Sequence, residues 1–246
     1  MHIDITFDFR SDTPPPKDPD APPNDPDTRS PTLRRYHKAL WSKEVPKGGV
    51  LTLEEGHPGH YLYHWSEELG EFSLSSDAVV PSFSREPRMA SVIEQIPPDD
   101  LRTFNSLGYT IGGMMLFPGN RINKKMELNS ARGCHPRIKD RFDLTVECIR
   151  RHYCGEPSPL SEVIARYADF FTLFGDFRGY VEYFLLQDLV DDDCSAVRFH
   201  APFEDFATTS PLLGSVDAYR DYRRLAMDFL EARNLRIAGL NPLLSA

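Results

Sequence analysis

The chain has 246 residues, of which 40% are hydrophobic and 26% are charged, and its net charge is -9. These values are ordinary for a globular protein, and the negative charge argues against a general nucleic-acid coat or a basic membrane-surface protein. The opening MHIDITFDF does not resemble a secretory signal, and no apolar run reaches the roughly 20 residues of a membrane helix. The four cysteines form no CxxC pair. We therefore expect a cytoplasmic protein with reduced thiols that does not enter a membrane.

The first residues alternate between apolar and polar side chains. Ile3, Ile5, Phe7 and Phe9 stand at every second position, which predicts a strand with one buried face. Residues 11–30, called the Pro/Asp loop below, are rich in proline and aspartate and cannot form a helix or an inner strand. Ser30-Pro31 then predicts the start of a helix with an apolar face up to Trp41. The loop is expected to be internal, either as a solvated surface excursion or as a cover over a site.

Strand patterns dominate the first half of the chain and helix patterns the second half. Strands are predicted around residues 61–63, 72–74 and 109–117, with a partner strand at 126–128 and another strand at 197–201. Helices are predicted around residues 89–96, 101–108, 136–153, 160–171, 177–190 and 216–240. This order predicts an α+β fold, in which a mainly antiparallel sheet from the N-terminal half packs on helices from the C-terminal half. We expect one globular domain over residues 1–246.

Four strings resemble a known family. FDFRSDT, YTIGGMMLFPGNR, DRFDLTVECIRRHY and DFRGYVEYFLLQDLV resemble a family of uncharacterised bacterial cytoplasmic proteins of similar length, over most of the chain. The resemblance implies a single bacterial domain and brings no established activity with it. The segment PPNDPD makes the Pro/Asp loop longer than the family pattern, which argues that the whole loop is not essential.

Two acidic features are candidates for catalysis. The predicted first strand places Asp8 and Arg10 on its polar face, and Asp12 follows. Carboxylates beside an arginine could perform acid–base work or hold a metal, and a solvated edge-strand face is the alternative. Glu182 interrupts an apolar run, so burial would raise its pKa and equip it as a general acid or base. The alternative for Glu182 is a structural pair with an arginine.

A basic segment is the candidate for ligand binding. Residues 121–151 contain nine basic and four acidic residues, so their charge is +5 in a protein of -9. Such asymmetry can mark an anion site, and the start of a helix beside an arginine can hold phosphate. The predicted ligand-binding residues are Arg121, Asn129, Arg132 and Arg141. The alternative is a charged helix face with ion pairs three or four residues apart.

Other reactive side chains support weaker hypotheses. The spacing of Cys134, His135, Cys148, His152 and Cys154 matches no usual zinc pattern, so we predict no metal site. The string Ser75-Ser76-Asp77 lacks the glycine elbow of a hydrolase nucleophile, and His37 on an apolar helix face is expected to be packed and neutral.

Two functional hypotheses follow. The first is a protein that binds, and as an enzyme would process, a phosphate-bearing ligand such as a nucleotide or RNA, in the manner of a bacterial toxin or defence effector. The second is a non-catalytic protein-interaction module that uses the acidic loop and the last helix. An enzyme requires Arg10, Arg132 and the carboxylates to converge in one pocket. The sequence identifies no cofactor.

Overall fold

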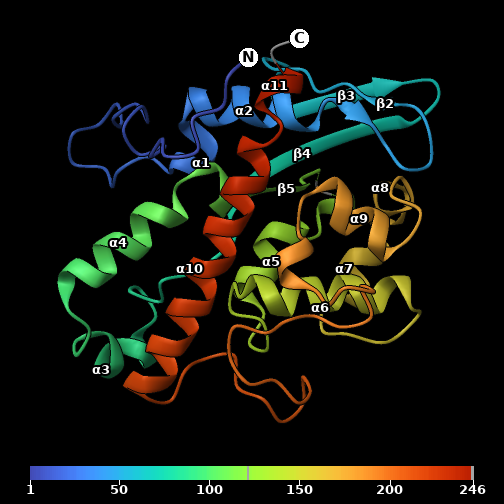
Figure 1. Ribbon diagram of the computed structural model, residues 1–246. Helices are drawn as coiled ribbons and strands as arrows, with labels where there is room; N and C mark the ends of the chain where they lie inside the picture. Colours follow the sequence, from blue (N-terminus) through green and yellow to red (C-terminus); the bar gives the residue numbers. More distant parts are fainter. Residues whose placement is uncertain (121, 245–246) are drawn as a thin grey trace.

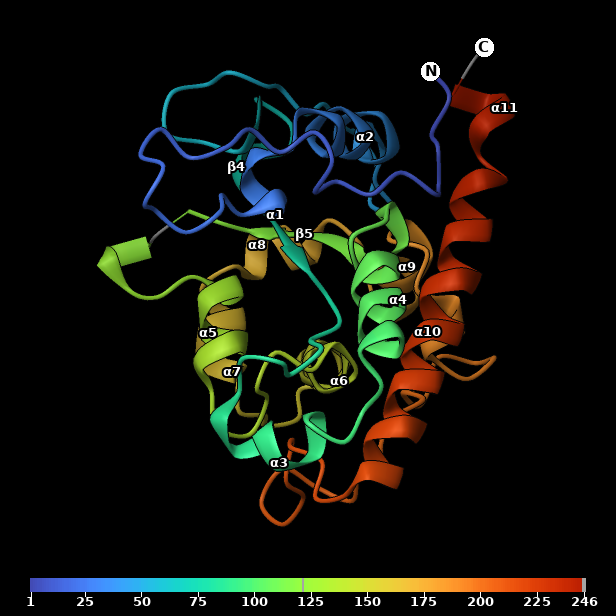
Figure 2. The ribbon, with the colours of Figure 1, turned by 90° about the vertical axis from the view of Figure 1, so that its left-hand side faces the viewer.

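The computed structural model describes residues 1–120 and 122–244, and it has an α+β fold. A three-stranded antiparallel sheet and the helix α2 (Pro31–Trp41) lie at one end of the molecule (Figure 1). The long helix α10 (Val216–Ala238) runs from the opposite end toward this one, between α4 (Pro98–Gly108) on one side and the remaining C-terminal helices on the other (Figures 1 and 2). The predicted fold class is confirmed.

The predicted opening strand is wrong. Residues 1–25 form turns and a loop, followed by the short helix α1 (Pro26–Arg29). Local hydrogen bonds take the backbone donors that a ladder would use: the Asp4 carboxylate accepts from the Thr6 amide (2.9 Å) and Asp8 accepts from the Arg10 amide (3.0 Å). Short polar side chains therefore fold the chain back on itself at both places.

Helix α2 follows the prediction closely. The Ser30 hydroxyl accepts from the Leu33 amide (3.1 Å), and Pro31 occupies the first helical position. Leu33, Tyr36, His37, Leu40 and Trp41 are all buried. The Asp12 carboxylate joins this cap, since it accepts from the Ser30 hydroxyl (2.5 Å) and the Thr32 amide (3.0 Å). The two ends of the Pro/Asp loop are thus fastened to one another at the start of α2.

The sheet is built from β3 (Leu62–Ser66), β4 (Gly70–Ala78) and β5 (Met114–Pro118), in the order β3-β4-β5. A separate two-stranded sheet pairs β1 (Lys43–Glu44) with β2 (Val50–Leu51). Strand β5 is buried along its whole length. It begins only at Met114 because Ile111–Gly113 forms a 3-10 turn, η2, whose Gly112 amide donates to the Asn234 side chain (2.8 Å). The predicted partner strand at 126–128 is wrong, since helix α5 (Leu128–Cys134) begins there.

The remaining helices are shorter than the sequence suggests. They are α3 (Ala90–Ile93), α6 (Phe142–Tyr153), α7 (Ser161–Ala165), α8 (Ala168–Thr172), α9 (Phe177–Tyr183) and α11 (Asn241–Leu244), with 3-10 turns at Pro87–Met89, Ile122–Lys124 and Gln187–Leu189. Helix α6 starts after Lys139 and Asp140, which have positive φ, and the predicted helix over 177–190 is interrupted by Leu185 at φ 58°. The predicted strand at 197–201 is reduced to one bridge, Val190 with Val197.

Helix α10 contributes a fully buried arginine to the core. Nη1 of Arg233 donates to the carbonyls of Gly112 (2.8 Å) and Met114 (2.8 Å), and Nε donates to the carbonyl of Phe184 (3.3 Å). Burial lowers the pKa of Arg233 to about 10. One side chain therefore ties α10 to β5 and to the end of α9. Across the described ranges, none of the helices has both the length and the apolar character to span a membrane.

Candidate functional site

A large cavity lies against the Pro/Asp loop. Its volume is about 1210 Å³. One wall consists of loop residues from Thr13 to Asp27, and the other walls come from residues 77–86, from the end of α4 with Tyr109, and from Gly133 and residues 139–140. Figure 2 shows α1 above the chain that leaves β4, with α4 and α5 on either side. Of the two alternatives left open for this loop, the structure supports the cover over a cleft.

Two carboxyl groups meet where α1 crosses the end of β4. Asp27 is only 6% exposed, and its Oδ2 accepts from the backbone amide of Ala78 (3.0 Å). Its Oδ1 is buried and receives no hydrogen bond from any described donor, and the Asp77 carboxyl lies close enough to influence its pKa. Two ionised carboxylates have no proton to donate. The contact is therefore a hydrogen bond only when the pair holds one proton.

The environment favours that shared proton. Burial, followed by the negative charge of Asp25, raises the pKa of Asp27 to about 7. Burial also raises the pKa of Asp77 well above its usual value; Arg132 opposes this, whereas the charges of Asp140 and Asp27 add to it. The proton belongs to the pair rather than to either residue. The pair can thus gain or lose a proton near neutral pH.

A buried arginine holds the carboxyl groups in place. Arg132 is 0% exposed, and its Nη1 pairs with Asp77 and with Oδ1 of Asp140 (2.9 Å). Its Nη2 donates to the backbone carbonyl of Asp140 (2.7 Å), and its Nε donates to the Thr145 hydroxyl (3.3 Å). Arg132 does not line the cleft. Its guanidinium is instead paired with two of the protein's own carboxylates.

Strained backbone is concentrated at this cleft. Among its lining residues, Phe83, Lys139 and Asp140 have φ values of 58°, 49° and 66°. Left-handed backbone costs a residue other than glycine roughly 1–2 kcal/mol, and such strain occurs preferentially at functional sites. For Asp140 the two bonds from Arg132 offset this cost.

Three cations line the same cleft. Arg10 pairs with Asp8 (2.5 Å), donates to the Ser106 hydroxyl (2.8 Å) and lies over the Tyr109 ring. Lys139 pairs with Glu86 (3.0 Å). Arg85 is exposed and has no ion-pair partner in the described part of the chain. The site therefore combines an acidic floor with a basic rim.

A model of a protein family matches residues 3–237 of this chain, which is nearly its whole length. The chain belongs to that family, described as a family of unknown function (DUF6994). Neither the curated proteins nor the solved structures gave a significant match. The family resemblance inferred from the sequence is confirmed, and the chemistry of this DUF6994 member has to be inferred from the site itself.

The predicted catalytic residues are separated in this DUF6994 member. Arg10 lines the cleft with Asp8 as its partner, whereas Asp12 caps α2. The expected burial of Glu182 is wrong, because α9 buries Phe177, Tyr180, Val181 and Tyr183 and turns Glu182 outward. The predicted convergence in one pocket is incomplete: Arg10 lines the cleft, Arg132 does not, and the carboxylates at the cleft differ from the predicted ones.

The predicted ligand-binding residues are used mainly inside the protein. Asn129 donates to the carbonyl of Ser76 (3.2 Å). Arg141 and Asp143 form a fully buried pair (2.5 Å), and Asp143 also accepts from the His200 amide (2.9 Å). Arg121 lies outside the described residues.

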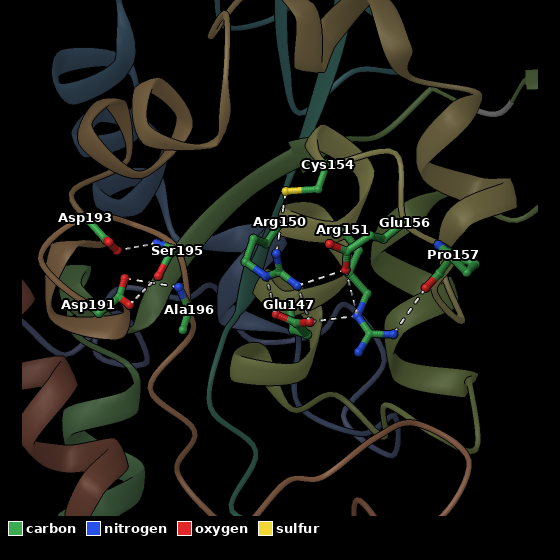
Figure 3. A network of polar contacts seen from close by, with 10 residues as sticks. All are labelled: Glu147, Arg150, Arg151, Cys154, Glu156, Pro157, Asp191, Asp193, Ser195 and Ala196. Carbon is green, nitrogen blue, oxygen red and sulfur yellow. Dashed lines mark hydrogen bonds and ion pairs between the residues drawn. The ribbon is translucent and has the colours of Figure 1, made fainter.

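The charged segment on α6 is largely neutralised by ion pairs. Glu147 binds both Arg150 (2.8 Å) and Arg151 (2.7 Å), and Arg150 also binds Glu156 (3.1 Å) (Figure 3). The Arg151 guanidinium donates in addition to the carbonyl of Pro157 (3.3 Å). For these arginines the alternative interpretation, a helix face of ion pairs, agrees with the structure.

A serine–histidine contact in the core is not a catalytic pair. The Trp41 indole donates to Nδ1 of His37 (3.1 Å), so the ring proton is on Nε2, which donates to the Ser76 hydroxyl (2.9 Å). Burial lowers the pKa of His37 to about 3. His37 therefore cannot accept the Ser76 proton. The prediction of a packed, neutral His37 is confirmed.

Sequence reasoning missed the carboxyl groups of the floor. Asp27 is one of several aspartates in the Pro/Asp loop, and nothing in the local pattern separates it from Asp18 or Asp20. Asp77 offered a weak signal, since it ends a strand that begins at Gly70. No group of three or more histidine, cysteine or acidic side chains suited to a metal occurs among the residues that the structure describes.

Proposed function

We propose that the protein is an acid–base enzyme whose substrate binds in the cleft and exchanges a proton with the Asp27–Asp77 pair. The observation that carries this proposal is the buried Oδ1 of Asp27, which receives no hydrogen bond from the described residues and belongs to a carboxyl that interacts with Asp77. A pair that titrates near neutral pH is matched to general acid and base catalysis. Asp77 is the member within reach of a substrate, because its side chain is 20% exposed.

Each residue of the floor has a role in this proposal. Asp77 gives its proton to the leaving group of the substrate, and the pair then takes a proton from the attacking water, which Asp77 and Asp27 share again. Arg132 is a positioning residue that orients Asp77 and stabilises it once it is ionised. The Asp140 side chain is 41% exposed and offers a second carboxylate at the same guanidinium. One protonated and one ionised carboxyl suffice to protonate a leaving group and to activate water, so hydrolysis is the reaction class favoured.

A second candidate function rests on the basic rim. Arg85 has no ion-pair partner among the described residues, and Arg10 and Lys139 line the same cleft. These cations support the hypothesis of a phosphate-bearing ligand, a nucleotide or RNA end, although they replace most of the arginines that the sequence suggested. In this second candidate function, the protein acts as a toxin or defence effector in the bacterial cytoplasm.

The acid–base proposal is tested by titrating the carboxyl carbons by NMR. We expect a carboxyl signal that titrates near pH 7 in the wild type and is lost in both Asp27→Asn and Asp77→Asn. Asp8→Asn is the matched control, since Asp8 pairs with Arg10 away from the floor. If no carboxyl titrates above about pH 5, where ordinary carboxyls are already ionised, the proposal is rejected and the non-catalytic interaction module gains support.

The phosphate candidate is tested by thermal melting. Nucleotides and a short RNA should raise the melting temperature of the wild type, since a ligand at 100 times its dissociation constant adds about 2.7 kcal/mol. The shift should be smaller in Arg85→Gln and unchanged in Arg102→Gln, a control on the exposed face of α4. Equal shifts in the two variants would contradict a role for the rim.

A further inference from the structure

The floor of the cleft has an excess of negative charge. Four carboxyl groups gather there: Asp25, Asp27, Asp77 and Asp140. The cation that contacts them from behind is Arg132. Even with one shared proton on the Asp27–Asp77 pair, four carboxyls against one guanidinium leave two negative charges.

The cations of the rim do not remove this excess. Arg10 and Lys139 are each held by a carboxylate outside the floor, Asp8 and Glu86 respectively. Arg85 makes no ion pair with any described carboxylate, and its single positive charge still leaves one of the two negative charges of the floor uncompensated. The floor is therefore able to attract a positive group from the ligand.

A buried acceptor at the floor also lacks a donor. Asp27 is more than nine-tenths buried, it lines the cleft, and its Oδ1 receives no hydrogen bond from the described residues. The loop wall adds few donors, because Pro14, Pro15, Pro16, Pro19, Pro22, Pro23 and Pro26 have no N–H group. Asp27 therefore presents an unmatched acceptor at this side of the cleft, and the complementary ligand group is a donor.

We propose that the ligand of this cleft carries an ammonium or guanidinium group, which binds at Asp77 and Asp140 and replaces the proton shared with Asp27. This inference deepens the proposed function and rests on the cleft as the substrate site. A cation at Asp77 stabilises the ionised pair, so binding expels the proton to solvent. No covalent bond is made or broken in this step.

The proton linkage fixes the pH dependence of binding. The groups that face Asp27 include Asp25, Asp77, Asp140 and Arg132, together with the phenols of Tyr61 and Tyr109. Because the pKa of Asp27 is raised to about 7, a cation competes with a proton below that pH. Its affinity should rise by up to about tenfold per pH unit below pH 7 and become constant above it.

The experiment compares four probes that share one alkyl chain: butylammonium, butylguanidinium, 1-butanol and butyrate. Calorimetry at constant ionic strength, in two buffers with different ionisation enthalpies, gives both the affinity and the number of protons released. We expect the two cations to bind about tenfold more tightly than the alcohol and the anion, since hydrogen bonds between charged groups are the strong ones. Close to one proton should leave per bound cation at pH 6 and almost none at pH 8.

Variants of the two carboxylates test where the cationic group of the probe binds. Asp77→Asn and Asp140→Asn should each weaken butylammonium binding about tenfold, whereas Asp217→Asn, in an exposed ion pair with Arg220 on α10, should leave it unchanged. Equal binding of alcohol and cation, or binding that does not depend on pH between 6 and 8, overturns the inference. If the pair titrates near pH 7 and the cations still do not bind, the acid–base proposal survives and this inference fails. If no carboxyl titrates near pH 7, the proposed function is rejected. The inference is rejected with it, because a cation that binds then displaces no proton.

Discussion

The guanidinium of Arg132 binds Asp140 twice, through the carboxylate Oδ1 (2.9 Å) and through the backbone carbonyl (2.7 Å). Asp140 has a φ of 66° and precedes helix α6, so this double contact fixes both its side chain and its backbone. The same Nη1 also pairs with Asp77 at the end of β4. One buried residue thus positions carboxylates from two distant parts of the chain.

Removal of Arg132 should be costly. Arg132→Met leaves Asp77 and Asp140 without their buried counter-charge, and breaking a buried pair from one side costs about 3–5 kcal/mol. Urea unfolding measures this loss. Arg150→Met is the control, since Arg150 is partly exposed and its loss should cost about 1 kcal/mol. Equal losses in the two variants would contradict the role assigned to Arg132.

The Asp27–Asp77 pair predicts an unusual pH dependence of stability. The folded-state pKa of Asp27, about 7, lies above its unfolded value near 3.8, so the folded protein binds more protons between these pH values. Asp27 therefore lowers the free energy of unfolding as pH rises from about 4 to 7, by at most about 1.4 kcal/mol per pH unit. Below pH 4 the carboxyl of Asp27 is protonated in both states, so the free energy of unfolding no longer changes with pH through this group.

His37 acts in the opposite direction, because its pKa falls from 6.5 to about 3 on folding and the unfolded chain binds the proton first. The two contributions overlap between pH 4 and 6.5 and partly cancel in the wild type. The difference between Asp27→Asn and wild type isolates the carboxyl contribution. Urea unfolding at several pH values should show the variant gaining stability relative to wild type up to pH 7, and a constant difference would disprove the linkage.

The start of α2 offers a double-mutant cycle. Ser30 accepts from the Leu33 amide and donates to Asp12, so Ser30→Ala should cost about 1–2 kcal/mol. Asp12→Ala should cost a similar amount through the Thr32 amide. Because the two side chains bond to one another, the double variant should lose less than the sum. Additive losses in chemical unfolding would show that the 2.5 Å contact contributes nothing.

Ser76 should behave as a structural residue. Ser76→Ala leaves the Nε2 proton of His37 buried without an acceptor, which costs about 1–3 kcal/mol. A fluorophosphonate probe should not label the native protein, because Ser76 is buried and His37 cannot take its proton. Mass spectrometry of the treated protein decides the point, and a labelled Ser76 would refute the tautomer assigned to His37.

Local patterns predicted the elements with clear end signals. Helix α2 has Ser30-Pro31, and α10 has a long apolar face, and both appear where expected. The opening strand failed because Asp4 and Asp8 bond to amides two residues away, which an alternating pattern does not reveal. The helix predicted over 136–153 is present as α6, but it begins only at Phe142 because Lys139 and Asp140 adopt positive φ.

The candidate site depends on contacts that no local pattern contains. Asp27 and Asp77 are fifty residues apart in sequence, and Asp27 becomes significant only because α1 lies across the end of β4. Of the residues that the sequence suggested, Arg10 lines the cleft and Arg132 pairs with Asp77, which also lines it. Arg132 was predicted to bind a ligand. In the structure its guanidinium pairs with Asp77 and Asp140, so it positions these carboxylates instead.

The buried arginine of α10 has a consequence for biosynthesis. Arg233 satisfies the carbonyls of Gly112, Met114 and Phe184, all of which are translated well before it. Until α10 leaves the ribosome, these carbonyls lack the donors of Arg233, and the core beside β5 lacks the buried face of α10. The body of the protein therefore completes its folding late, and a nascent chain arrested before residue 216 exposes apolar surface to chaperones and proteases.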